Sequence, residues 1–139
     1  MDANSSAVGQ FNFQLKQGSD TEISMTWLQD DGVTPMSLVG YSMELTIRAF
    51  VSNAAALLSM NSTAQSGSRI VLGGAAGTID LIFDAADTAA LPLGAVSVGN
   101  QFGGLPVYQL GVYDLRFTDP SGSIGYLLEG SITLDPRVT

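Results

Sequence analysis

Apolar and polar residues alternate along much of the chain with a period of two, which is the pattern of half-buried β-strands. The alternation is longest over residues 42–48, where Met43, Leu45 and Ile47 point one way and the polar residues between them the other. The same pattern predicts further strands over residues 11–16, 22–27, 70–72 and 78–83.

The last third of the chain predicts a β-hairpin. Residues 113–117 and 127–134 are two alternating segments, and residues 118–122, of sequence Thr-Asp-Pro-Ser-Gly, lie between them. Asp, Pro and Gly supply the backbone geometry of a tight turn, so the two segments should pair in an antiparallel manner.

Other segments interrupt the strands. Residues 29–35 combine Asp, Gly and Pro and predict a chain reversal, and residues 73–77 are glycine-rich and predict a turn rather than a phosphate-binding loop. Residues 52–57 fit either a helical turn or a wide loop. One short helix is expected near residues 84–91, with Asp84 as its N-cap and Pro92 ending it.

Two segments do not resemble core elements. Residues 1–9 are small and polar and are expected to form a flexible N-terminal arm. Residues 94–106 are rich in glycine and predict an inserted loop, yet this loop contains apolar residues that loops seldom expose. We therefore expect partner contacts from the arm and this loop, through Val8, Val96, Val98, Phe102 and Leu105.

These elements predict an all-β protein: an antiparallel sandwich of about seven or eight strands with one short helix, forming a single domain over residues 10–139. The strand pattern places six aromatic residues on inward-facing stripes, where they should pack in the core: Phe11, Phe13, Trp27, Phe83, Tyr113 and Phe117.

The composition narrows the class of partners. The net charge is −8, and the five Lys and Arg residues are scattered along the chain, so binding to nucleic acid is not expected. Only 13% of the residues are charged, about half of the roughly 25% usual for soluble domains, and the mean hydropathy is +0.27. A surface with so little charge fits either an ordinary Ser/Thr/Gly-rich β-domain or a chain covered by neighbours in an assembly.

No enzyme chemistry is expected from these residues. The chain contains no His and no Cys, which removes the usual general base, disulfides and thiolate metal sites, and a Ser-Lys pair would have to use the one lysine, Lys16. Three pairs of carboxylates remain, and turn and cap roles are favoured for them over a structural Ca²⁺ site or glycosidase chemistry. These pairs are Asp30 with Asp31, Asp84 with Asp87, and Asp114 with Asp119. No cofactor or metal is expected.

The order and spacing of the turns and strands resemble small phage virion proteins of the baseplate upper protein N-terminal type. The resemblance covers roughly residues 14–136. The segments that carry it are residues 17–20, Trp27, residues 31–35, 38–41, 43–48, 73–82, 89–92, 113–115, 118–122 and 128–134. Residues 94–106 look inserted relative to this family, and residues 1–9 extend the N-terminus.

The resemblance implies an immunoglobulin-like β-sandwich and a non-enzymatic role in a phage particle, as an adaptor in the tail, baseplate or fibre attachment region. A capsid cement protein that bridges capsomers is the alternative, and a carbohydrate-binding module is a weaker one. The expected partners are other virion proteins and further copies of this chain, with no membrane. Residues 1–6 have no basic or apolar run typical of a leader, so the chain is expected to be made in the host cytoplasm and to end in the virion.

Overall fold

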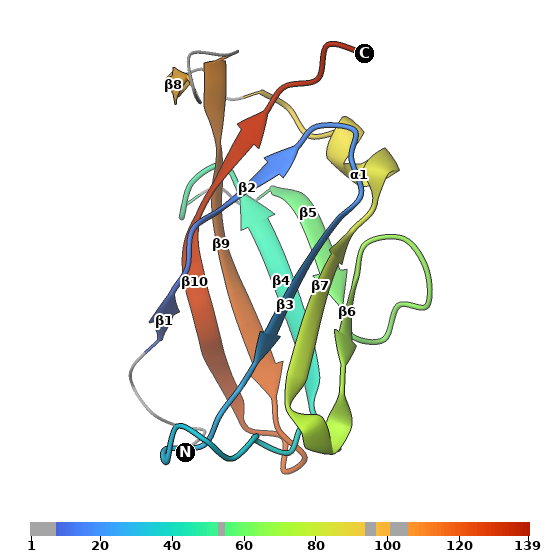
Figure 1. Ribbon diagram of the computed structural model, residues 1–139, viewed down its shortest axis with the longest axis vertical. Coiled ribbons are helices and arrows are strands. Elements are labelled where there is room, and N and C mark those ends of the chain that lie inside the picture. Colours follow the sequence, from blue (N-terminus) through green and yellow to red (C-terminus); the bar gives the residue numbers. More distant parts are fainter. Residues whose placement is uncertain (1–7, 53–54, 94–96, 101–105) are drawn as a thin grey trace.

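Two β-sheets lie face to face and enclose the core (Figure 1). The computed structural model describes residues 8–52, 55–93, 97–100 and 106–139. Sheet A has the strand order β1-β10-β9-β4-β5, with β2 also paired to β10 and β8 also paired to β9, and sheet B has the order β3-β7-β6. The strands are β1 (Gly9–Gln10), β2 (Phe13–Lys16), β3 (Thr21–Thr26), β4 (Ser42–Arg48), β5 (Ala56–Asn61), β6 (Arg69–Leu72), β7 (Thr78–Phe83), β8 (Ser97–Asn100), β9 (Pro106–Thr118) and β10 (Ile124–Asp135).

The core lies between the sheets and is built from the inward residues of the alternating strands. Leu45 and Ile47 of β4 and Leu115 of β9 are completely buried. The Trp27 ring, 6% exposed, lies 5.2 Å from the ring of Phe117 and 6.0 Å from that of Tyr41. The period-two pattern therefore identified the inward face of these strands correctly, and the sandwich with one short helix is confirmed.

The hairpin of β9 and β10 is longer than its sequence pattern indicated and forms the middle of sheet A. Asp119 Oδ1 accepts hydrogen bonds from the backbone N–H groups of Ser121 (2.9 Å) and Ser123 (3.0 Å), and Gly122 takes a left-handed conformation with φ of 93°. This is the turn chemistry that the sequence predicted.

The short helix α1 (Ala85–Ala89) forms as expected, but a different carboxylate caps it. Asp84 occupies the N-cap position without a capping hydrogen bond from its side chain. Instead, the backbone N–H of Ala85 donates to Asp20 Oδ1 at 2.7 Å. Asp20 just precedes β3, so the cap ties the helix to sheet B, and only the tertiary fold brings these two residues together.

One expectation about the sheets is wrong: the sandwich is not wholly antiparallel. Both β1 and β2 run parallel to β10, with Gly9 opposite Leu128 and Phe13 opposite Ile132. After pairing with β10 in sheet A through β1 and β2, the chain crosses to sheet B, where β3 begins. β1 and β2 are not joined to β10 by a tight turn, so they can run parallel to it. The described residues contain ten strands rather than seven or eight.

Three other segments differ from their sequence-based description. Gly9, expected in the flexible arm, pairs with β10 in β1, and residues 56–61 form the strand β5. Within the expected loop at 94–106, residues 97–100 form β8 and Pro106 already belongs to β9. Phe11 is not a core residue, because the backbone between β1 and β2 leaves its ring 39% exposed.

Candidate interaction surfaces

The outer face of sheet A carries a groove of about 690 Å³, which we call the sheet A groove. Its floor is made of outward side chains of β4, β9 and β10, and its borders include Val8 beside β1 and Val51 in the loop after β4. Five of the residues that line it are charged: Glu44, Arg48, Asp114, Arg116 and Glu129.

Strand register arranges these charges in rows across the floor. Glu44 on β4 lies opposite Arg116 on β9, and their side chains form an ion pair of 2.9 Å between Oε1 and the guanidinium Nη2. In the neighbouring row, Asp114 on β9 lies directly opposite Glu129 on β10. Like charges in this position repel each other, so the second row is held at an electrostatic cost.

Burial, more than this repulsion, sets the pKa of Asp114. Burial raises the pKa of the Asp114 carboxyl, and the nearby Glu129 and Glu44 raise it further, whereas Arg116 and Arg48 lower it. The two arginines thus outweigh the repulsion from the two glutamates, and burial accounts for the raised pKa. The groove presents both signs of charge side by side, which suits recognition of a polar protein segment through ion pairs and hydrogen bonds.

Tyr113 of β9 is among the residues that line the groove. The phenol of Tyr113 is largely buried, and burial raises its pKa to about 12, so it stays protonated at neutral pH. Its hydroxyl donates to the carbonyl oxygen of Phe11 at 2.6 Å. Among the described residues, no group of three or more His, Cys, Asp or Glu side chains is placed to hold a metal ion.

The two ends of the sandwich expose apolar side chains. At the end where β9 turns into β10, Val33 is 78% exposed, and Leu28, Val39 and Ile124 are also exposed. At the opposite end, where α1 lies (Figure 1), Val51 is 88% exposed, and Phe50, Leu93 and Val138 are also exposed. We call these groups the hairpin end and the helix end.

Of the five predicted contact residues, only Val8 has a described side chain. Val8 is half-buried and lines the sheet A groove. Val96, Phe102 and Leu105 lie outside the described residues, and Val98 belongs to β8, whose backbone alone is described. The expectation that these residues contact a partner stays a prediction.

The carboxylates chiefly serve local structure. Asp31 accepts hydrogen bonds from the backbone N–H groups of Val33 and Thr34 and from the Thr34 hydroxyl, and these bonds lower its pKa to about 2. Asp87 Oδ2 accepts a bond of 2.6 Å from the Ser68 hydroxyl. Asp114 differs from the expected turn role, since it lies within β9 and its carboxylate neighbour is Glu129 rather than Asp119.

Sequence reasoning missed the charged rows of the sheet A groove. The alternation over residues 42–48 places Glu44 and Arg48 on the polar face of a strand, which is correct. What it lacked was the register with β9 and β10, because partners such as Arg116 and Glu129 are far away in the sequence.

None of the helices in the described part of the chain has the length and apolar character needed to cross a membrane. A scan against models of protein families finds no match, and neither does a search of curated proteins.

Solved structures that match are similar to this chain at low sequence identity. A crystal structure of chicken TCR is similar over 95% of this chain and 55% of that chain, with 12% identity and a TM-score of 0.42. Extracellular domains 3–5 of Drosophila OTK are similar over 95% of this chain and 34% of that chain, with 16% identity and a TM-score of 0.33. The chain therefore spans about half of the first and a third of the second, and the similarity to these immunoglobulin-like structures is distant and concerns the fold alone.

Proposed function

We propose that this chain is a non-enzymatic structural protein of a phage particle, where it acts as an adaptor in the tail, baseplate or fibre attachment region through protein–protein contacts. It works alongside other virion proteins and further copies of itself. The resemblance of its turns and strands over residues 14–136 to baseplate upper proteins motivates the setting.

The observation that carries the proposal is the exposure of apolar side chains at both ends of the sandwich. Val33 is the most exposed of them at the hairpin end, at 78%, and Val51 is the most exposed at the helix end, at 88%. Burying each large apolar side chain against a neighbour is worth roughly 1.5–3 kcal/mol before the costs of ordering. A domain with such a surface at each end suits a position between two neighbours.

A capsid cement protein is the second candidate, because low surface charge and apolar ends also suit a protein that bridges capsomers. The copy number separates the two: hundreds of copies per particle favour the shell, and a few to dozens favour the tail. For a carbohydrate-binding module, aromatic rings should share one exposed face. Of the exposed aromatic residues Phe11, Phe50 and Tyr126, only Tyr126 lines the sheet A groove, which argues against that role.

The test is incorporation into particles of variants changed at one end only. Val33→Ser with Val39→Ser alters the hairpin end, and Phe50→Ser with Val51→Ser alters the helix end. A matched control, Val71→Ser, changes an exposed valine on β6, away from both ends. Each variant is supplied in trans to a phage deleted for the gene, and purified particles are assayed by quantitative mass spectrometry.

We expect each double variant to fold as the wild type does and to be lost from particles, while the control is retained. Retention of both double variants at wild-type copy number would contradict the adaptor role. Loss of only the helix-end or only the hairpin-end variant would contradict a position between two neighbours. Absence of the wild-type chain from purified particles would contradict the virion setting as a whole.

A further inference from the structure

The three-stranded sheet B has an open border at β3. In the described part of the chain, β7 is the only strand that pairs with β3, through six consecutive residue pairs from Thr21–Phe83 to Thr26–Thr78 without a bulge. The next pair in this register is closed by a bond of 2.9 Å from Trp27 N–H to the Gly77 carbonyl. Antiparallel pairing alternates, so the odd-numbered residues of β3 bond to β7. The backbone N–H and C=O groups of Glu22, Ser24 and Thr26 therefore point away from β7, outward from the open border of the sheet.

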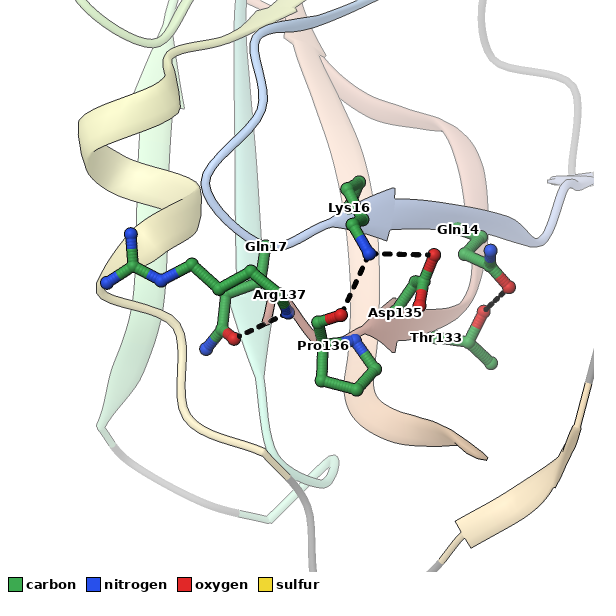
Figure 2. Close-up of polar contacts among 7 residues, drawn as sticks. All are labelled: Gln14, Lys16, Gln17, Thr133, Asp135, Pro136 and Arg137. Atoms are coloured by element: carbon green, nitrogen blue, oxygen red, sulfur yellow. Dashed lines mark hydrogen bonds and ion pairs between the residues drawn. The ribbon is translucent and has the colours of Figure 1, made fainter. Parts of the chain in front are cut away.

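Residues 9–17 are not available to cover this border, because pairing with β10 and contacts at the end of sheet A hold them there (Figure 2). Lys16 Nζ donates to the Pro136 carbonyl at 2.8 Å and forms an ion pair of 3.4 Å with Asp135 Oδ2. Gln17 Oε1 accepts from the backbone N–H of Arg137 at 3.2 Å. Figure 2 shows Lys16 at the end of β2, and Gln17 after it, facing residues 135–137.

Proteins usually protect the border strands of their sheets with charges, bulges, interruptions or short length. The other borders here carry such devices. The pairing of β5 with β4 shifts register between Ile47 and Arg48, β1 and β2 are separated by residues 11–12, and β6 has only four residues. β3 has one charge, Glu22, and neither a bulge nor a proline over its six residues. It is the least protected border in the described structure.

We propose that β3 pairs with β3 of a second copy of this chain, antiparallel and centred on Ser24, so that two three-stranded sheets join into one of six strands. In this register Glu22 of each copy lies opposite Thr26 of the other, and the two Ser24 residues face each other. It is the register with the most backbone hydrogen bonds, and it keeps the two glutamates apart.

The side chains of β3 fit the same arrangement. Ile23 and Met25 point toward the core but remain only half-buried at the border of the sheet. In the centred register, Ile23 of one copy meets Met25 of the other, so each covers the other's exposed part. The interface is thus self-complementary, which is the requirement for contact between identical chains around a two-fold axis. It does not depend on the proposed place in a phage particle.

The test is the oligomeric state of the whole chain, measured by sedimentation velocity from micromolar to millimolar concentration. Ionic strength should be physiological, because a Debye length of about 8 Å then screens the repulsion between two chains of charge −8. The wild type should form a dimer. Ser24→Lys should weaken the association by at least about tenfold, because two ammonium groups would face each other across the axis.

The matched control is Ser59→Lys, the same substitution at an exposed position of the border strand β5, and it should leave the dimer unchanged. Amide hydrogen exchange adds a readout at single residues. The amides of Glu22, Ser24 and Thr26 should become protected as concentration rises, while those of Ile23 and Met25 are protected throughout. A monomeric wild type at millimolar concentration would overturn the proposal, and so would a dimer disrupted by Ser59→Lys but not by Ser24→Lys.

Discussion

The buried phenol of Tyr113 ties the segment between β1 and β2, at the border of sheet A, to β9. Tyr113 on β9 lies opposite Gly130 on β10, and its hydroxyl crosses to the carbonyl oxygen of Phe11 on the far side of β10. The crossing is open because position 130 has no side chain: a Cβ there would lie 2.1 Å from that carbonyl oxygen. The Tyr113 ring also packs edge-on against Phe13, with 5.0 Å between ring centroids.

Tyr113→Phe should lower the free energy of unfolding by about 1 kcal/mol, because it removes this hydrogen bond while keeping the ring. The measurement is urea denaturation of the purified chain. Tyr126→Phe, at a position where the ring is 46% exposed, is the control and should have little effect. Equal effects of the two substitutions would show that the bond to Phe11 does not stabilise the fold.

The carboxyl of Asp114 should give stability a pH dependence of unusual sign. Because its pKa is raised on folding, the folded chain holds this proton more tightly than the unfolded chain does. Its contribution should therefore become less favourable as pH rises from the unfolded pKa of 3.8 through the folded pKa. Asp114→Asn should gain stability relative to the wild type over that rise, as measured by urea denaturation at a series of pH values.

Asp119 provides the opposite case, because the Ser121 hydroxyl and three backbone N–H groups lower its pKa. Its stabilising effect is present above pH 3.8 and is lost as pH falls through the lowered folded pKa. Asp119→Asn should therefore lose stability relative to the wild type at neutral pH, and the difference should shrink in acid. If the stability differences of Asp114→Asn and Asp119→Asn from the wild type changed with pH in the same direction, burial would not be raising the pKa of Asp114.

At the scale of elements, the pairing of β1 and β2 with β10 depends on how closely residues 11–12, which join the two strands, approach β10. Phe11 N–H donates to the Glu129 carbonyl at 3.0 Å, and Ser131 N–H donates to Asn12 Oδ1 at 2.9 Å. These bonds bracket Gly130, so the segment that joins β1 to β2 lies directly over the glycine.

Gly130→Ala should displace that segment, since the new methyl group would overlap the backbone of Phe11. We expect a loss of about 1–3 kcal/mol in the free energy of unfolding, the usual cost of overpacking. In NMR spectra, amide shifts of residues 9–12 should change more than those of β4. Unchanged shifts at residues 9–12 would mean that the edge strands do not rely on the glycine.

The whole molecule combines several surfaces that a partner could cover: two apolar ends, a groove of mixed charge on sheet A and the open border of sheet B. The two ends lie at opposite ends of the sandwich (Figure 1), and the groove and the open border belong to different sheets, so contacts with several neighbours are geometrically compatible. The adaptor role and the pairing of β3 between copies can be tested independently. Incorporation into particles tests the apolar ends, and self-association of the purified chain tests β3.

Much of the local structure could be read from the sequence. Alternation identified the inward residues of β4, β7 and β9, and turn chemistry located the reversals at Asp31 and Asp119, since each signal depends on neighbours within a few positions. The short helix followed from its residue types for the same reason.

The tertiary structure alone decided which strands are neighbours. The strand order and register in turn determine the groove on sheet A and the open border of sheet B. An alternating pattern states which residues share a face, but it does not state which strand lies beside them or in which direction it runs. Hence the parallel pairing of β2, the cap of α1 by Asp20, the row of Asp114 and Glu129 and the open border of β3 appear only when distant segments come together. Period two is a property of one strand, whereas register and edge exposure belong to pairs of strands.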